Sequence, residues 1–313
     1  SCEVGDVCAG SSATELICSL AWAISPSKGS NIVSTRASFP STVYPWRRVA
    51  EANGAEIRLA EHDKSLYTSP DDILELIDDQ TSVVTLSHVE YSNGQRYDLK
   101  MFAEAAHSVD ALLIVDATQS MGMVPIAAPS TGADALVSSG YKWLRGTYGA
   151  AVAYVSAAIR GQLNPGLVGF RSNADLWDLR ADRMDLPKDA SRFEFTTLHF
   201  GAALGLAEAV EEINEIGIEK VWKHDIGLAD LIIEGSRRMG IEVASPTTED
   251  ERSAIVSLRL PNGISSKEIS RRLQNEHSII VTSRAGLLRV SPHIDNDARD
   301  VSALFEALSS LLE

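Results

Sequence analysis

Short apolar runs alternate with amphipathic stretches along the first two-thirds of the chain. The apolar runs are rich in β-branched residues and predict strands buried on both faces, at 31–35, 55–60, 82–89, 111–117, 134–139 and 149–156. Between the runs, apolar positions at helical spacing predict helices at 13–24, 69–77 and 99–109. In the second helix, Ser69 is placed as a cap and Pro70 suits the first turn. Strands separated by helices predict an α/β fold, with a mostly parallel sheet and helices on both faces.

The pattern changes near residue 200. A long helix is predicted at 201–217, with acidic residues on its exposed face. The segments that follow are an apolar stretch at 229–240, strands at 254–260, 278–283 and 287–293, and helices at 265–276 and 300–312. This pattern predicts a smaller α+β domain at 206–313, after a large domain at 1–205. No repeat or low-complexity linker separates the two, so we expect them to pack closely.

Composition narrows the classes of partner. The chain has 313 residues, a formal net charge of -15 and 44% hydrophobic residues. An acidic protein repels phosphate backbones, so we expect no nucleic-acid partner. There is no apolar run long enough for a membrane span and no signal-peptide pattern at the start, which predicts a cytoplasmic protein without a membrane partner. The three cysteines, Cys2, Cys8 and Cys18, have no C-x-x-C spacing, so we expect neither a disulfide framework nor a metal site.

Two residues at predicted strand ends suggest a ligand site. Asp116 ends the run "ALLIVDA", and Lys142 follows the run "DALVSS", 26 residues later. Ligands of parallel α/β sheets bind beyond the carboxyl ends of the strands, so both side chains can reach one pocket. Taken singly, Asp116 could instead cap a helix and Lys142 could be a solvated surface charge.

A lysine amine and a carboxylate in one site suit pyridoxal 5'-phosphate (PLP). The lysine forms a Schiff base with the aldehyde, and the carboxylate keeps the pyridine nitrogen protonated. The phosphate needs backbone N–H groups, which the helix start in "AGSSATELI" can supply. The same segment is also readable as a capping box, Ser12 with Glu15, and the two interpretations are compatible.

Five segments in order resemble the class V aminotransferases of the fold-type I PLP enzymes. They are "FPSTVYPWRRVAEANGAEIRL", "SHVEYSNGQRYDL", "VDATQS…DALVSSGYKWLRGTYGAAVAYV", "SRFEFTTLHFGAALGL" and "LLRVSPHIDNDARDVSALFEAL". The family includes cysteine desulfurases, selenocysteine lyases, kynureninases and isopenicillin N epimerase-like proteins. The resemblance covers nearly the whole chain and implies a fold-type I PLP-dependent transferase that acts as a homodimer with shared active sites.

The resemblance also implies roles for residues around the ring. Lys142 is the Schiff-base lysine and proton carrier, and Asp116 pairs with the pyridine nitrogen. Gln119 donates to the phenolic oxygen of the cofactor. His88 stacks on the ring face; without the family it would be an ordinary histidine at a strand end.

Further roles concern the phosphate and the substrate. Ala13, Thr14 and Ser139 hold the phosphate, and Thr197 reaches the phosphate in the neighbouring subunit. Tyr141 stands where the desulfurases have a phosphate-binding histidine, and is counted among the cofactor-binding residues. Arg289 binds the α-carboxylate of the substrate as a bidentate fork.

The chain departs from the desulfurase pattern at several points. The segment "IIVTSRAGLLRVS" has no cysteine, whereas a desulfurase carries its nucleophilic cysteine on a loop before the carboxylate-binding arginine. The stretch "SFPST" replaces a histidine pair, and Thr196 replaces a glycine. Members of the family have an N-terminal arm before the segment at which this sequence begins, so we expect that arm to be missing.

The sequence therefore predicts a PLP-dependent enzyme that acts on an amino acid through an external aldimine. Our first interpretation is an aminotransferase or epimerase-like enzyme, and the alternative is a C–S or C–Se lyase of the desulfurase or selenocysteine lyase kind. From other classes we considered a nucleotide-binding α/β module, which lacks its glycine-rich phosphate loop here. A pseudoenzyme is disfavoured because Lys142, Asp116 and Arg289 are all retained.

Overall fold

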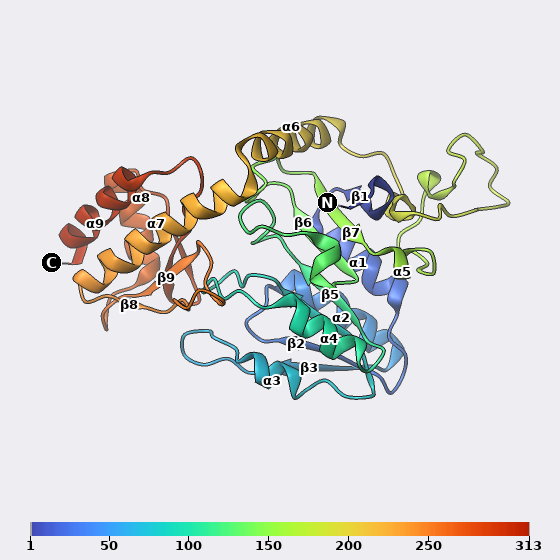
Figure 1. The fold of residues 1–313 in the computed structure, drawn as a ribbon, viewed down its shortest axis with the longest axis horizontal. Helices are drawn as coiled ribbons and strands as arrows, with labels where there is room; N and C mark the ends of the chain where they lie inside the picture. Colours follow the sequence, from blue (N-terminus) through green and yellow to red (C-terminus); the bar gives the residue numbers. More distant parts are fainter. Residues whose placement is uncertain (1, 313) are drawn as a thin grey trace.

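The computed structural model describes residues 2–312 and contains two sheets (Figure 1). The larger sheet has seven strands in the order β1-β7-β6-β5-β4-β2-β3. Their bounds are β1 Val7–Gly10, β2 Asn31–Thr35, β3 Glu56–Ala60, β4 Thr81–Ser87, β5 Leu112–Asp116, β6 Ala135–Ser139 and β7 Ala151–Val155. Neighbours from β3 to β6 pair in parallel, and only β7 runs against the rest. The mostly parallel sheet expected from the sequence is therefore present.

Helices cover both faces of this sheet. The helices are α1 Ala13–Ile24, α2 Pro40–Asn53, α3 Pro70–Leu74, α4 Leu99–His107 and the short α5 Ala157–Arg160. Residues of α1 and α2, such as Leu16 and Trp46, pack with Ile114 on one face. Phe102 of α4 packs with Leu113 on the other face, because successive strand residues point to opposite sides.

The smaller sheet is antiparallel and lies toward the C-terminus. Its order is β10-β11-β9-β8, with β8 Glu242–Val243, β9 Val256–Arg259, β10 Thr282–Arg284 and β11 Leu287–Val290. Helices α7 Ile218–Arg238, α8 Ser266–His277 and α9 Ala298–Leu312 pack on it around one apolar cluster. Helix α6, Phe200–Ile216, precedes α7, and the predicted boundary after residue 205 falls inside α6. The division at that point remains a prediction.

The long connection between α5 and α6 projects from the body of the molecule (Figure 1). It contains only short 3-10 turns, at Phe170–Ser172 and Ala190–Phe193. No helix within residues 2–312 is long and apolar enough to cross a membrane.

Candidate active site

A cavity opens at the carboxyl edge of the large sheet. It comprises about 420 Å³ of empty space, including its open mouth. Its lining comes from the ends of β4, β5 and β6 and from the first turns of α1 and α2: Ala13, Thr14, Phe39, Ser41, Ser87, Val89, Tyr91, Asp116, Thr118, Gln119, Ser139, Tyr141 and Lys142. This is the edge at which ligands of parallel sheets bind. The cavity thus brings together seven of the predicted residues: Ala13, Thr14, Asp116, Gln119, Ser139, Tyr141 and Lys142.

Asp116 is buried and held in one orientation. Thr42 Oγ1 donates to Asp116 Oδ2 at 3.0 Å, and the backbone N–H of Thr118 donates to Oδ1 at 3.0 Å. No helix begins at this residue, so the alternative of a helix cap does not apply. The carboxylate is therefore a fixed acceptor at the floor of the cavity.

Lys142 lies across the cavity, in the turn that follows β6. Burial lowers its pKa to about 8; the charge of Asp116 opposes this shift and that of Arg289 adds to it. Its Nζ is 5.6 Å from the centroid of the Phe39 ring. At that pKa about a tenth of the amines are neutral at pH 7 and about half at pH 8, far more than for a free lysine. The neutral form is the one that a nucleophile or general base requires.

The N-termini of helices α1 and α2 border one end of the cavity. Ser12 caps α1 by accepting from the N–H of Glu15, as expected, whereas the Glu15 carboxylate accepts from Ser11. Thr14 Oγ1 donates to Ser41 Oγ at 2.9 Å, which links the first turns of α1 and α2. Free backbone N–H groups and the positive ends of two helix dipoles make this end suitable for a phosphate.

A second cavity adjoins the first at Gln119 and Lys142. It comprises about 550 Å³ of empty space and is further lined by Trp143, Arg289, Ser291 and His293. Arg289 lies on β11 of the small sheet, and its Nη1 donates to the carbonyl of Tyr91 at 2.6 Å. Burial lowers the pKa of Arg289 to about 10. Its Nε is buried without a hydrogen-bond partner in the part of the chain that the structure describes. A guanidinium with unused donors suits a carboxylate ligand.

His88 does not reach either of these cavities, which corrects the expectation that it stacks on a ligand. Ser87 pairs with Asp116 across β4 and β5 and faces the cavity, so the next residue points to the opposite face. His88 lines a separate cavity with Arg96 and Tyr97. Burial, with the charge of Arg96, lowers the pKa of His88 to about 3. His88 thus lies outside the cavity that Asp116 lines.

Phe39 is the aromatic residue that faces the cavity instead. It precedes Pro40, the first residue of α2, in the "SFPST" stretch that departs from the family pattern. Its ring meets that of Tyr91 edge to face, with centroids 5.2 Å apart. The departure of "SFPST" from the family pattern was the sequence signal for Phe39, because a substituted residue next to a helix start can still line the site.

Two other predicted residues contact neighbouring side chains, and a third is exposed. Gln119 Oε1 accepts from Trp143 Nε1 at 2.9 Å, which leaves the amide N–H groups of Gln119 for a ligand. Tyr141 stacks on Tyr148, with ring centroids 4.4 Å apart. Thr197 is exposed on the long connection and lines neither cavity of this chain. Its expected contact is with a neighbouring subunit, so this geometry does not test it.

The arrangement fits PLP. The cavity offers a fixed carboxylate, an amine with a lowered pKa, an amide donor and two helix N-termini, which are the partners that a pyridine nitrogen, an aldehyde, a phenolic oxygen and a phosphate require. Asp116, Lys142, Gln119 and the α1 and α2 first turns would hold these four groups in that order.

No cysteine lines either cavity within residues 2–312. Cys8 is buried in the core beneath α1, and burial raises the pKa of its thiol to about 12. Cys2 is exposed and Cys18 lies within α1. The thiol of Cys8 is therefore a packed, unreactive group.

Comparisons with known proteins identify relatives and structures of the same fold. The chain is 27% identical over 301 residues to a probable cysteine desulfurase of Methanothermobacter thermautotrophicus, covering 91% of this chain and 74% of the relative. It is 23% identical over 316 residues to an uncharacterized aminotransferase of Bacillus subtilis, covering 98% and 80%. The fold matches an apo cysteine desulfurase of Thermococcus onnurineus with a TM-score of 0.90 at 24% identity, over 99% of this chain and 80% of that one. It matches a cystine C–S lyase with a TM-score of 0.90 at 19% identity, over 98% and 82%.

The sequence pattern of the aminotransferase class-V family matches residues 7–304, nearly the whole described chain. The strand order of the large sheet and the lysine at the carboxyl edge of that sheet are those expected of a fold-type I PLP enzyme. The chain therefore belongs to the class V aminotransferase family of PLP-dependent enzymes.

Proposed function

We propose that this enzyme is a C–S lyase that eliminates sulfur from a sulfur-containing amino acid without forming a persulfide on the protein. The observation that carries the proposal is the position of Lys142 between two cavities, one with Asp116 and one with Arg289, neither lined by a cysteine. Relatives named as cysteine desulfurases support the sulfur chemistry. The cystine C–S lyase of the same fold, whose product is described as cysteine persulfide, supports a sulfur that leaves on a small molecule.

Each residue has a defined task in this proposal. Bound PLP supplies an electron-withdrawing ring that acidifies the Cα proton of the substrate. Lys142, with its lowered pKa, takes that proton and returns one to a product atom. Asp116 keeps the pyridine nitrogen protonated, and Arg289 holds the α-carboxylate so that the Cα–H bond points at Lys142.

Other residues position the cofactor. Phe39, in place of His88, contacts the ring face and cannot exchange protons. Gln119 donates to the phenolic oxygen. The phosphate accepts from the first turns of α1 and α2 and from the hydroxyls of the residues that line that end: Thr14, Ser41 and Ser139.

The elimination balances without an external reductant. With cystine, the Cα–H and Cβ–S bonds break, and water completes the hydrolysis of the three-carbon fragment. One cystine and one water give one cysteine persulfide, one pyruvate and one ammonia. With cysteine, the sulfur product is sulfide.

The test is product identification on the PLP-loaded protein. Cystine, cysteine and a sulfur-free control such as alanine are supplied, each with and without a keto acid. We expect pyruvate and ammonia in equal amounts from a sulfur-containing substrate and no need for a keto acid. A strict requirement for a keto acid would reject the lyase.

That second outcome would favour transamination or epimerisation, the first interpretation of the sequence. The similarity to the Bacillus subtilis aminotransferase, over 98% of this chain, supports this candidate. Exchange of the Cα proton with solvent deuterium, without pyruvate, would identify an epimerase.

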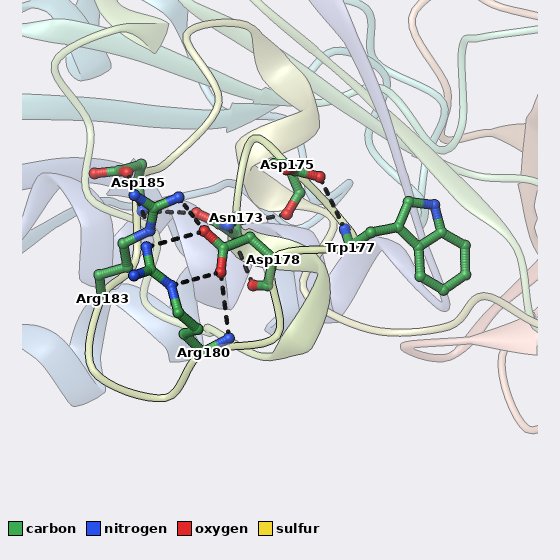
Figure 2. A network of polar contacts seen from close by, with 7 residues as sticks. All are labelled: Asn173, Asp175, Trp177, Asp178, Arg180, Arg183 and Asp185. Carbon is green, nitrogen blue, oxygen red and sulfur yellow. Dashed lines mark hydrogen bonds and ion pairs between the residues drawn. The ribbon is translucent and has the colours of Figure 1, made fainter.

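We also propose that the enzyme is a homodimer with shared sites. The connection before α6 presents large apolar side chains to solvent, with Trp177 87% exposed, and Phe200 and Leu204 on α6 are 65% and 71% exposed. Figure 2 shows how the loop is held: Asp178 accepts from Arg180 and Arg183, and Trp177 points away from this network. A second copy would cover these side chains and bring its Thr197 to the cavity.

Mixing two inactive variants tests the shared sites. We expect Lys142→Ala and Thr197→Asp each to be inactive, since the second change adds a negative charge beside the phosphate. In a random mixture of the two chains, half of the dimers are mixed and carry one intact site, so about a quarter of the activity should return. No recovery, or a monomer in sedimentation, would argue against shared sites.

A further inference from the structure

A buried acid–histidine pair lies beside the lysine turn and has no task in the proposed reaction. His293 follows β11, and its Nδ1 lies 2.7 Å from Asp225 Oδ2 on α7. Its Nε2 lies 3.0 Å from the carbonyl oxygen of Trp143, the residue after Lys142. The side chain of Asp225 is fully buried, and its Oδ1 has no hydrogen-bond partner among residues 2–312.

The geometry fixes how many protons the pair holds. A carbonyl oxygen only accepts, so Nε2 of His293 must carry a hydrogen. The contact to Asp225 also needs a proton, either on Nδ1 or on the carboxyl. The pair is therefore imidazolium with carboxylate, or imidazole with carboxylic acid. In both forms it holds one proton more than a neutral histidine beside an ionised aspartate.

The pair acts on the cofactor cavity through Trp143. The Trp143 indole donates to Gln119 and thereby fixes which end of that amide faces the cavity. Its ring meets the His293 ring edge to face, with centroids 4.9 Å apart. Its carbonyl is also approached by Gly122, where an added Cβ would lie 2.3 Å from the oxygen. The carbonyl next to Lys142 is thus hydrogen-bonded by His293 and closely packed against Gly122.

The segment after β11 holds the lysine turn at a second point. Arg145 closes the turn by donating its N–H to the Lys142 carbonyl at 2.8 Å, and its guanidinium pairs with Asp295 at 3.0 Å. Strand β11 itself carries Arg289. The element that would bind the substrate carboxylate is therefore continuous with the segment that holds Lys142.

We propose that Asp225 and His293 are positioning residues that fix Trp143, and through it Lys142 and Gln119, as long as the pair holds its proton. Loss of that proton leaves one ring nitrogen facing an acceptor, so one of the two hydrogen bonds breaks. This proposal rests on the proposed function, because it takes over the role given there to Lys142.

The surroundings agree with a retained proton. Burial raises the pKa of Asp225, while its hydrogen bond to His293 and the charges of His293 and His224 oppose the shift. A raised pKa means that the proton is bound below it and lost above it. The other charged groups near the pair are Lys142 and Arg289 across the cavity, and Arg145, Asp295 and Glu212 at the turn.

A matched set of variants distinguishes a role in positioning Trp143 and Lys142 from a role in the stability of the fold alone. In Asp225→Asn the introduced amide donates to Nδ1 of a neutral His293, and Nε2–H still donates to Trp143, so both hydrogen bonds survive without a titrating proton. Asp225→Ala removes the partner, and His293→Gln removes the bridge between Asp225 and Trp143.

The first measurement is ¹⁵N NMR of histidine rings in the cofactor-free protein, with His293 assigned by its loss in His293→Gln. We expect Nε2 to be protonated at pH 7 in the parent and at every pH in Asp225→Asn. This result does not depend on any reaction, so it stands apart from the proposed function. An Nε2 without a proton at pH 7 in the parent would overturn the proposal.

The second measurement is PLP affinity by titration from pH 6 to 10. We expect Asp225→Ala and His293→Gln to weaken binding about tenfold, the order expected for the loss of one buried hydrogen bond, and Asp225→Asn to match the parent at pH 7. Above the pair's pKa the parent should weaken relative to Asp225→Asn; Lys142 is common to both and cancels. Equal losses in all three variants, or identical pH profiles for the parent and Asp225→Asn, would show a structural role only.

Discussion

The two cavities that meet at Lys142 are assembled in different ways. The one at Asp116 is built from residues 13–142, at strand ends and helix starts of a single sheet. The one at Arg289 joins that sheet to residues 289–293, which come from the other end of the chain. The first is set by the rigid large sheet, and the second depends on how the small sheet rests on the lysine turn. We therefore expect changes in the first cavity to affect every reaction step, and changes at Arg289 in the second to affect mainly which substrate binds.

The largest effect should come from Lys142→Ala, because Lys142 belongs to both cavities. We expect kcat to fall about 10³-fold with any substrate, since a positioned proton carrier contributes 10²–10⁴-fold. The control is Lys188→Ala on the exposed connection, which should leave kcat unchanged. A Lys142→Ala enzyme within tenfold of the parent would contradict the role of the shared lysine.

The next largest effect should come from Asp116→Asn. The amide can accept from the Thr118 N–H and donate to the Thr42 hydroxyl, so the fold tolerates it. The ring loses its carboxylate partner, and we expect kcat to fall about 10²-fold, a size typical of losing one preorganised polar partner. PLP should remain bound, as followed by absorbance. Unchanged turnover would remove Asp116 from the electron-withdrawing role.

These two positions were predictable from the sequence, and the reason is local. Asp116 and Lys142 each follow an apolar run, and the end of such a run at the edge of a parallel sheet is a strong positional signal. Phe39 and His88 show the limit. Whether residue 87 or 88 faces the cavity depends on where β4 meets β5, and a shift of one residue reverses the answer. Likewise, helix α2 was missed because Pro45 lies inside it, where a proline normally argues against a helix.

The second cavity was predicted only through the resemblance. Nothing in "LLRVSPH" tells that His293 meets Asp225, 68 positions earlier, or that both lie beside Trp143. Such contacts arise from the packing of the small sheet against the large one. Strands β9 and β11 fall within predicted strands, β10 overlaps one only in part, and β8 was not predicted. The placement of the small sheet does not follow from the pattern at all.

Arg289→Lys should sharpen the comparison by changing one cavity alone. A lysine cannot form the bidentate fork, so we expect KM for the amino acid to rise 10–30-fold, about 1.4–2 kcal/mol, with kcat changed less than threefold. PLP affinity should stay unchanged. A fall in kcat with constant KM would place Arg289 in the chemistry and not in binding.

The smallest expected effect concerns the pH at which the free enzyme captures PLP. Because the pKa of Lys142 is lowered to about 8, the neutral amine is the major form above that pH and the minor form below it. The capture rate should therefore fall tenfold per pH unit below about 8. Arg289→Gln removes a positive charge and should move the midpoint up, and Asp116→Asn should move it down. A midpoint that is unchanged by both substitutions would show that the charges of Asp116 and Arg289 do not affect Lys142.

The most direct test of the central claim uses an enzyme without thiols. The three cysteines are replaced together, Cys2→Ser, Cys8→Ala and Cys18→Ser, and the PLP-loaded protein is given cystine or cysteine without reductant. Pyruvate production is followed, and the intact chain of the parent is weighed during turnover. The account predicts that the thiol-free enzyme retains the parent kcat within about threefold, since ordinary core and surface substitutions act on stability and not on the reaction. With cysteine as substrate, whose sulfur leaves as sulfide, it also predicts no added sulfur on the parent chain. A sulfur adduct on the parent, lost together with activity in the thiol-free enzyme, would contradict the account and place the protein among enzymes that use a persulfide on their own cysteine.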